Sequence, residues 1–311
     1  IIGSQFVAGN TIANAIKNSQ ADIKEGYSHS YDMLGEAAVC QADTERYFQA
    51  YLTSINTLGE QNGAFGQYGV SIKLSALHPR YEYAKKEILL DELTGKLKIL
   101  VSAARNHNIP ITIDAEESYR LELSLLIFEQ VFNDPICDGW PHFGLAVQAY
   151  QKRALYVIKH LTTLAKNRKQ KIPLRLVKGA YWDTEIKLAQ QLGLADYPVF
   201  TRKANTDLSY LSCATELFRQ GEHFYPQFAG HNAHTITSII ELSTQHSGVE
   251  FEFQRLHGMG KAMFDVVKQR FPKLNCRIYA PVGEYNMLLP YLVRRLLENG
   301  ANTSFIHHFN D

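Results

Sequence analysis

From about residue 66 onward, short apolar runs alternate with longer stretches in which apolar positions recur at helical spacing. The runs that predict strands lie at 70–74, 109–113, 143–147, 174–177, 227–229, 251–254, 277–279 and 303–306. The stretches that predict helices lie at 89–106, 118–131, 153–166, 184–192, 207–219, 233–243, 260–270 and 288–298. This alternation predicts an α/β fold, a closed (βα)8 barrel of parallel strands, with an open doubly wound sheet as the alternative.

The first part of the chain has a different texture. Residues 11–60 read as helical, and Ile12, Ile16 and Ile23 are spaced for one helix face. We therefore expect two regions: an N-terminal helical segment at 1–62 that packs on the barrel, and the barrel itself at 63–311. The G-x-G-x-x-G loop that often marks a dinucleotide-binding open sheet is absent.

Composition narrows the function. The 311 residues carry a formal net charge of +1, so no strong field attracts nucleic acid or an anionic membrane. The four cysteines form no C-x-x-C pair, which disfavours a disulfide framework or a zinc cluster and fits reduced thiols in a cytoplasm. No apolar run approaches the roughly 20 residues of a membrane-spanning helix. Because the chain opens at Ile1 rather than Met, we expect a fragment of a longer protein.

Polar residues follow the predicted strands, where a parallel barrel gathers its chemistry. Arg175 alternates with apolar neighbours, so it is expected to point into the barrel or its mouth, where it needs an anionic or hydrogen-bonding partner. The resulting pocket is cationic, has one carboxylate and suits an anionic cofactor with an amino acid substrate. Its expected members are Lys73, Asp114, Gln148, Arg175, Lys178, His231 and Tyr279.

Blander interpretations exist for several of these residues. Lys73 could lie at a strand edge, and Asp114 could simply cap the next helix. His231 and His234 are three residues apart and could share a metal, although no third ligand follows a familiar pattern. A helix start with His231 aimed at a phosphate is the more natural interpretation.

A charged cluster near the C-terminus stands at helical spacing: Tyr291, Arg294, Arg295 and Glu298. The two arginines lie about 100° apart on such a helix, so both can point toward one spot. A guanidinium binds a carboxylate through two parallel hydrogen bonds, so the pair predicts a clamp for a small carboxylic acid. The alternative is a solvated face on which the arginines pair with Glu298.

Ten sequence strings of this chain, in the same order, match those of a known family. They are SYDMLGEAA, SIKLSALHPRY, IDAEES, QAYQKR, RLVKGAYWD, YPVFTRK, HNAHT, LHGMG, RIYAPVG and YLVRRLLENGANTSF. The chain closely resembles the proline dehydrogenase domain of proline utilisation A, a bifunctional bacterial flavoenzyme family. The resemblance implies a distorted (βα)8 TIM-like barrel with extra N-terminal helices, non-covalently bound FAD, and a last helix over the barrel mouth.

The resemblance also implies residue roles. Arg294 and Arg295 would bind the carboxylate of L-proline, and Glu298 would lock their helix. Lys73 would support the clamp by pairing with Glu36. The remaining substrate contacts would be Asp114 near the amine, Leu256 as an apolar wall and Tyr279 against the ring.

The implied FAD site is larger. Arg175 would contact the flavin near N5, and with Asp114 it forms the implied catalytic pair. The other implied contacts to FAD are Ile113, Gln148, Val177, Lys178, Gly179, Ala180, Tyr181, Trp182, Thr201, Lys203, Gly230, His231 and Asn232. The family string ATHNAH stands here as AGHNAH, so Gly230 replaces a threonine and a side-chain contact to FAD is expected to be missing.

The implied reaction oxidises L-proline to Δ1-pyrroline-5-carboxylate by hydride transfer to flavin N5, with a quinone as the next electron acceptor. The family implies a fused or associated aldehyde dehydrogenase domain, no nucleic acid bound by this fragment, no metal, and a cytoplasmic location with peripheral contact to the inner membrane face. Whether Asp114 is a base or only orients substrate stays open. The rival interpretations are a metal- or Schiff-base-dependent enzyme using His231, His234 or Lys178, and a non-catalytic amino acid sensor.

Overall fold

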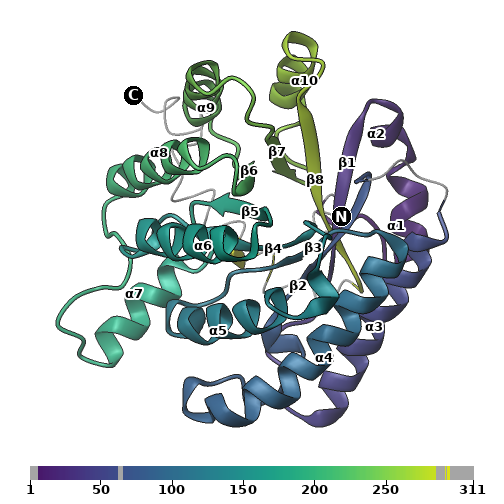
Figure 1. The fold of residues 1–311 in the computed structure, drawn as a ribbon, viewed down its shortest axis with the longest axis vertical. Helices are drawn as coiled ribbons and strands as arrows, with labels where there is room; N and C mark the ends of the chain where they lie inside the picture. Colours follow the sequence, from purple (N-terminus) through teal and green to yellow (C-terminus); the bar gives the residue numbers. More distant parts are fainter. Residues whose placement is uncertain (1–5, 62–65, 285–290, 292, 295–311) are drawn as a thin grey trace.

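Eight parallel strands form a closed barrel in the computed structural model, which describes residues 6–61, 66–284, 291, 293 and 294 (Figure 1). Each strand pairs with its neighbours in chain order, and β8 pairs with β1 to close the ring. The strands are β1 (Tyr27–Met33), β2 (Tyr68–Ile72), β3 (Ile111–Ile113), β4 (Phe143–Gln148), β5 (Ile172–Val177), β6 (Phe224–Ala229), β7 (Glu252–Leu256) and β8 (Asn275–Val282). The closed topology confirms the predicted barrel and excludes the open sheet.

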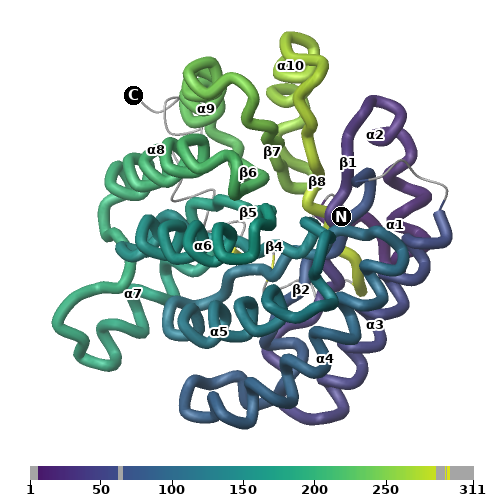
Figure 2. The backbone as a smooth tube through the Cα atoms, viewed as in Figure 1, coloured from purple at the N-terminus to yellow at the C-terminus, as the bar shows by residue number. Residues whose placement is uncertain are grey.

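Helices surround the barrel, and the tube view shows them following the strands around its outside (Figure 2). Two short helices, α1 (Ile12–Asn18) and α2 (Gln20–Lys24), precede β1. The longer ones are α3 (Gln41–Gly59), α4 (Lys86–His107), α5 (Leu121–Phe132), α6 (Ala154–Arg168), α7 (Trp182–Gln191), α8 (Lys203–Arg219), α9 (Ala233–Gln245) and α10 (Lys261–Arg270). Except for α7, their apolar faces bury against the outer side of the strands, which explains the periodicity seen in the sequence.

The prediction of a wholly helical segment before residue 63 is wrong for β1. This strand lies between β2 and β8 and is part of the barrel, so the barrel does not begin at residue 63. Its sequence, YSHSYDM, alternates small or charged residues with aromatic ones, and the polar positions hid it from a search for apolar runs. The strand expected at 303–306 lies outside the described residues, and β1 closes the barrel without it.

The barrel interior is unusually polar, whereas the layer between strands and helices is apolar. On β1, Ser30 and Asp32 face the interior, where Ser30 bonds Ser71 of β2 and Asp32 bonds Lys73. The aromatic positions of the same strand face outward: the Tyr31 hydroxyl meets Ser19 beside α2. One strand therefore supplies both the polar lining of the barrel and part of the apolar layer.

On the outward face of β1, His29 is fully buried, with its Nε2 3.8 Å from a carboxylate oxygen of Asp22 in α2 and its ring stacked on Tyr31. Burial lowers the pKa of His29, although Asp22 acts in the opposite direction. An ordinary histidine in the unfolded chain has a pKa of about 6.5 and binds a proton below that pH. In the folded chain the same imidazole stays neutral to a lower pH.

Acidification is therefore expected to destabilise the fold through His29. Below the unfolded pKa the unfolded state binds more protons than the folded state, so stability falls as pH falls, by up to about 1.4 kcal/mol per pH unit for this group. Urea unfolding at mildly acid and neutral pH should show a smaller loss for His29→Phe than for the wild type. His257, whose pKa burial also lowers, stays in both proteins as a shared background. Equal losses of stability in the wild type and His29→Phe would show that His29 does not cause the acid sensitivity.

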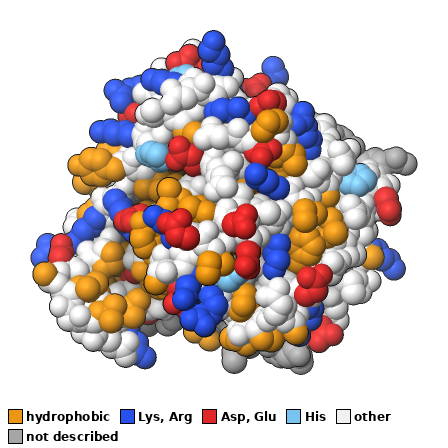
Figure 3. Space-filling view, turned by 60° about the horizontal axis from the view of Figure 1, so that its bottom comes forward, with side chains coloured by type: hydrophobic (Ala, Val, Ile, Leu, Met, Phe, Trp, Pro, Cys, Tyr) orange, Lys and Arg blue, Asp and Glu red, His pale blue; other side chains and the backbone are white. Residues whose placement is uncertain are grey.

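The surface carries no large field of one sign on the face shown in Figure 3, where basic and acidic side chains are interspersed. This agrees with the net charge of +1. Within the part of the chain that the structure describes, none of the helices combines the length and the hydropathy that crossing a bilayer requires.

Candidate functional site

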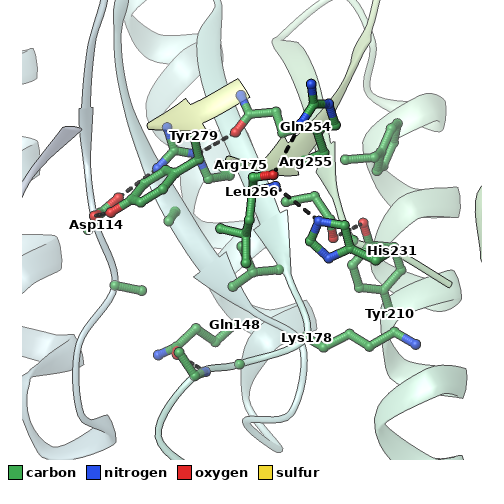
Figure 4. A pocket seen from close by; sticks show the side chains of 18 of the residues that line it. Asp114, Gln148, Arg175, Lys178, Tyr210, His231, Gln254, Arg255, Leu256 and Tyr279 are labelled. Carbon is green, nitrogen blue, oxygen red and sulfur yellow. Dashed lines mark hydrogen bonds and ion pairs between the residues drawn. The ribbon is translucent and has the colours of Figure 1, made fainter. Parts of the chain in front are cut away.

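The main cavity opens where the barrel strands end, and its wall carries most of the residues singled out in the sequence. Figure 4 shows Asp114, Arg175 and Tyr279 grouped on one side, with His231 and Tyr210 on the other. The predicted residues that line it are Lys73, Asp114, Gln148, Arg175, Val177, Lys178, Gly179, Ala180, Tyr181, Gly230, His231, Asn232, Leu256, Tyr279 and Arg294. The barrel topology thus brings together residues that are far apart in the chain.

Asp114 stands at the centre of the polar end of the cavity. It directly follows β3, and its backbone N–H still bonds Ile72 of β2, so the strand ladder fixes its position. Its two oxygens accept hydrogen bonds from Arg175 Nη1 at 2.6 Å, from the Tyr279 hydroxyl at 2.6 Å and from Lys73 Nζ at 3.3 Å. The carboxylate is therefore held by three donors from three different strands or strand ends. This geometry does not favour the alternative in which Asp114 only caps the next helix.

Lys73 is paired below Asp114 with a carboxylate that the sequence analysis missed. Its Nζ lies 2.7 Å from Oδ1 of Asp32, a fully buried side chain of β1. Burial alone would lower the pKa of Lys73, but Asp32, Tyr279 and Asp114 together raise it well above its ordinary value. Lys73 is therefore an ammonium group at neutral pH. The alternation of β1 between outward aromatic and inward polar residues was the signal that could have identified Asp32.

Arg175 projects from β5 into the barrel and is almost fully buried. Besides the bond to Asp114, its Nε donates to Gln254 Oε1 at 2.6 Å and its Nη2 donates to Ser71 Oγ at 3.0 Å. The guanidinium carbon lies 5.1 Å from the centre of the Tyr279 ring, within cation–π range. The prediction that Arg175 points inward and finds anionic and polar partners is confirmed.

Arg294, which also lines the cavity, binds Glu36 through its two terminal guanidinium nitrogens, at 2.6 and 2.7 Å. The expected pairing of Lys73 with Glu36 is therefore wrong, because Lys73 is already held by carboxylates inside the barrel. Burial alone would raise the pKa of Glu36, but the hydrogen bonds and charge of Arg294 lower it below its ordinary value. Arg294 also lies over the Tyr181 ring, 5.1 Å from its centre, so the solvated-face alternative does not hold for Arg294.

The rest of the C-terminal cluster is described only in part. Tyr291 is buried and lines the cavity beside Arg294. Arg295, Glu298 and the expected strand at 303–306 lie outside the described residues, so the second arginine of the clamp stays a prediction. The helix expected at 288–298 is described only at Tyr291, Val293 and Arg294, which are helical.

The wider part of the cavity contains backbone and amide groups. Gln148 at the end of β4 donates to the carbonyl of Glu116 at 2.8 Å and accepts from the backbone N–H of Ala180 at 3.3 Å. Gly179 has φ +141°, and a Cβ there would overlap the Tyr150 ring, so this turn requires glycine. At Gly230 a Cβ would meet nothing within 4 Å, which leaves open space at the cavity wall.

Asn232 caps α9, since its Oδ1 accepts from the backbone N–H of Thr235 at 2.9 Å. His231 Nε2 accepts from the backbone N–H of Leu256 at 3.0 Å, which joins β6 to the end of β7. Among the described residues, no group of three or more histidine, cysteine or carboxylate side chains could hold a metal ion. His231 is therefore engaged in the wall of the cavity rather than in a metal cluster of that kind.

Four predicted contacts lie outside the cavity lining that the described residues form: Ile113, Trp182, Thr201 and Lys203. Ile113 is buried in β3, and the Trp182 indole donates to the carbonyl of Phe200 at 2.9 Å. Lys178 lines the cavity and forms an ion pair with Asp207 of α8. The described residues thus bring together Lys73, Asp114, Arg175 and Tyr279 at the polar end of the cavity, while the implied contacts at the remote end line it only in part.

Comparison with known proteins gives a consistent result. The family model described as proline dehydrogenase matches residues 15–308. Over its whole length the chain is 50% identical to the bifunctional protein PutA of Escherichia coli (strain K12). It is 26% identical to proline dehydrogenase 1 of Bacillus subtilis (strain 168) over 97% of this chain and 88% of that protein.

Solved structures agree. A variant of Bradyrhizobium japonicum proline utilisation A matches with a TM-score of 0.88 and 48% identity, over 97% of this chain and 31% of that one. Proline utilisation A from Bdellovibrio bacteriovorus inactivated by N-propargylglycine matches with a TM-score of 0.92 and 29% identity, over 97% of this chain and 33% of that one. The chain spans about a quarter of the length of the curated PutA proteins that it matches (24%).

Proposed function

The chain belongs to the proline dehydrogenase family, and on this premise we propose that it oxidises L-proline to Δ1-pyrroline-5-carboxylate with non-covalently bound FAD. One observation carries the proposal. One cavity is lined both by Arg294, whose guanidinium suits a carboxylate, and by a cluster in which Asp114 is held by Arg175, Lys73 and Tyr279. A cyclic amino acid has a carboxylate that can bind Arg294 and an amine that can bind Asp114.

The cavity residues fit FAD. Gln148 offers an amide at the mouth of β4, Lys178 offers a cation, and the turn at Gly179 brings its backbone to the cavity surface. The open space at Gly230 and the N-terminus of α9 suit phosphate groups. When bound, FAD supplies the acceptor for the hydride that leaves the ring carbon next to nitrogen.

Asp114 is best suited to orient the substrate amine. Its oxygens already accept three hydrogen bonds, so it offers negative charge at a fixed point rather than a free base. The nearby Arg175 supplies positive charge on the same side of the cavity, where it can stabilise an electron-rich cofactor ring. Tyr279 connects the two, since its hydroxyl bonds Asp114 and its ring lies beside the guanidinium.

Arg294 and, from the sequence, Arg295 would bind the proline carboxylate. In the present structure Glu36 occupies the guanidinium fork of Arg294 with the same geometry that a substrate carboxylate would adopt. Binding therefore exchanges one carboxylate for another instead of exposing an unpaired buried arginine. Leu256 and Tyr279 would contact the apolar ring between the two ends, since both line the same cavity.

The wider role of the parent protein is part of the same proposal. Because the matched PutA proteins are called bifunctional and this chain covers 24% of their length, we infer that the complete protein has a second part, which the family resemblance implies to be a fused or associated aldehyde dehydrogenase. A quinone would accept the electrons, and the protein would be cytoplasmic with peripheral contact to the inner membrane face. This part of the chain would bind no nucleic acid.

Adding proline anaerobically to the purified, FAD-loaded chain tests the activity. The visible flavin absorption should bleach, because the flavin takes up the electrons of the substrate. A yellow protein that proline does not bleach would favour the amino acid sensor. A colourless protein with bound zinc would favour a metal enzyme.

Gly230→Thr is expected to tighten FAD binding. The substituted Cβ meets open space, so the hydroxyl can add a hydrogen bond to the cofactor without displacing backbone, worth about 1 kcal/mol or about fivefold in the dissociation constant. Fluorescence titration of the apoprotein with FAD measures it. Gly230→Val is the matched control, because it has the same shape and no hydroxyl. Equal affinities for the two variants would contradict a polar contact at this position.

A further inference from the structure

A third ion pair inside the barrel lies deeper than the site described above. Arg277 of β8 binds Glu252 of β7 through two nitrogens, with Nε–Oε1 at 2.7 Å and Nη2–Oε2 at 3.0 Å. Glu252 is completely buried and Arg277 is 7% exposed. Arg277 also donates to the backbone carbonyl oxygens of His29 and Gly66, so its guanidinium is fixed to the wall. This pair belongs to the rigid frame of the barrel.

Gln254 joins this ion pair to the site. Its Nε2 donates to Glu252 Oε1 at 2.7 Å, and its Oε1 accepts from Arg175 Nε at 2.6 Å. Only one orientation of the amide satisfies both partners, because the carboxylate can only accept and the guanidinium can only donate. Gln254 is 2% exposed, so the loss of either bond would leave a buried polar group without its partner. The two short contacts therefore fix the amide, and the amide fixes the Nε edge of Arg175.

Charges alternate along this row of buried side chains. Arg277 and Glu252 form one pair, Arg175 and Asp114 form the next, and Lys73 with Asp32 follows. The row holds three cations and three anions, so the charges balance. Gln254 is the neutral member between the first and second pairs. Through its two hydrogen bonds it anchors Arg175 to the Glu252–Arg277 pair, and it adds no charge beside Arg175.

We propose that Gln254 is a positioning residue for Arg175: it connects the guanidinium to the Glu252–Arg277 pair and so holds its positive charge at the cofactor end of the cavity. The proposal rests on the proposed function only in naming FAD as the group that senses this charge. Without the amide, the Nε–H of Arg175 is buried with no acceptor, and the guanidinium keeps the bonds of its other two nitrogens to Asp114, Ser71 and Ser30. Arg175 then shifts toward those partners, and its charge stabilises the reduced flavin less well.

Gln254→Met is the test, because methionine has nearly the volume of glutamine but neither hydrogen bond. We expect the midpoint potential of bound flavin, titrated with dithionite, to fall. We also expect the rate of flavin reduction by proline to fall about tenfold, with the KM for proline unchanged within about twofold. Flavin content verifies that the variant is folded. If Gln254→Met does not fold, Gln254→Asn, whose amide cannot reach both partners, is measured in its place.

Gln227→Met is the matched control. Gln227 lies on β6 in register with both Arg175 and Glu252, is buried, and its side-chain oxygen has no hydrogen-bond partner among the described residues. It should leave potential and rate near those of the wild type. An unchanged potential and rate in Gln254→Met, or equal losses in both variants, would overturn the proposal.

The two readouts also separate this proposal from the proposed function. The dithionite titration uses no proline, so the potential decides the role of Gln254 even in a protein that does not oxidise proline. If the midpoint potential of Gln254→Met falls below that of the wild type as expected, but proline bleaches neither protein, the proposed function alone is contradicted. Bleaching by proline with no difference in potential or rate would contradict the role of Gln254 alone.

Discussion

Arg294→Met is expected to raise the KM for proline by about ten- to a hundredfold, with kcat changed only a few-fold. The substrate carboxylate loses a charged, two-point hydrogen bond worth about 1.5–3 kcal/mol, and that interaction serves binding before and during the reaction alike. The Glu36 carboxylate also loses its partner, so part of the effect reflects a rearranged wall. Steady-state kinetics over a wide range of proline concentrations measures both constants.

A matched control separates the loss of the clamp from the loss of any arginine. Arg219→Met removes an arginine that also pairs with a glutamate, but at the surface of α8. This control should leave the KM for proline unchanged. If Arg294→Met also leaves it unchanged, Arg294 does not bind the substrate carboxylate.

Asp114→Ala is expected to lower turnover by about a hundredfold while FAD stays bound. The change removes the acceptor that Arg175, Lys73 and Tyr279 share, and it leaves the buried Arg175 without its counter-charge at the point where the substrate amine would bind. The Lys73 ammonium keeps Asp32, so the cluster is not dismantled. Stopped-flow measurement of flavin reduction, with the flavin content determined in parallel, measures the loss.

Asp114→Asn is the control for this prediction. It keeps the shape and one acceptor oxygen but not the negative charge, so turnover should lie between that of the wild type and that of Asp114→Ala. A flavin-replete Asp114→Ala protein with normal turnover would remove Asp114 from the mechanism. Equal losses in both variants would show that charge, rather than shape, is what the site requires.

Helices and strands could be predicted from the sequence where burial produces a regular pattern of apolar positions. From β2 to α10 the strands and helices alternate as expected, because apolar strands packed under amphipathic helices leave a clear periodic record. β1 left no such record, since its inner face carries Ser30 and Asp32 and its outer face carries aromatic residues. A strand that faces a polar barrel interior cannot be found by hydrophobicity alone.

The same reason limits what could be known of the site. Residues at strand ends, such as Asp114 and Arg175, could be placed because a parallel barrel gathers all strand ends at one mouth. Their partners could not, because pairing depends on the register between strands distant in the chain. Gln254 was missed for this reason, and Glu36 was assigned to Lys73 although it binds Arg294. Asp32 was missed because β1 itself was not recognised as a strand.

Single-turnover analysis under anaerobic conditions tests the central claim most directly. The FAD-loaded chain is mixed with proline, and reduced flavin and Δ1-pyrroline-5-carboxylate are measured in the same sample. The account predicts that both form together, one product molecule for each flavin reduced. Flavin that stays oxidised while proline remains unchanged would contradict it.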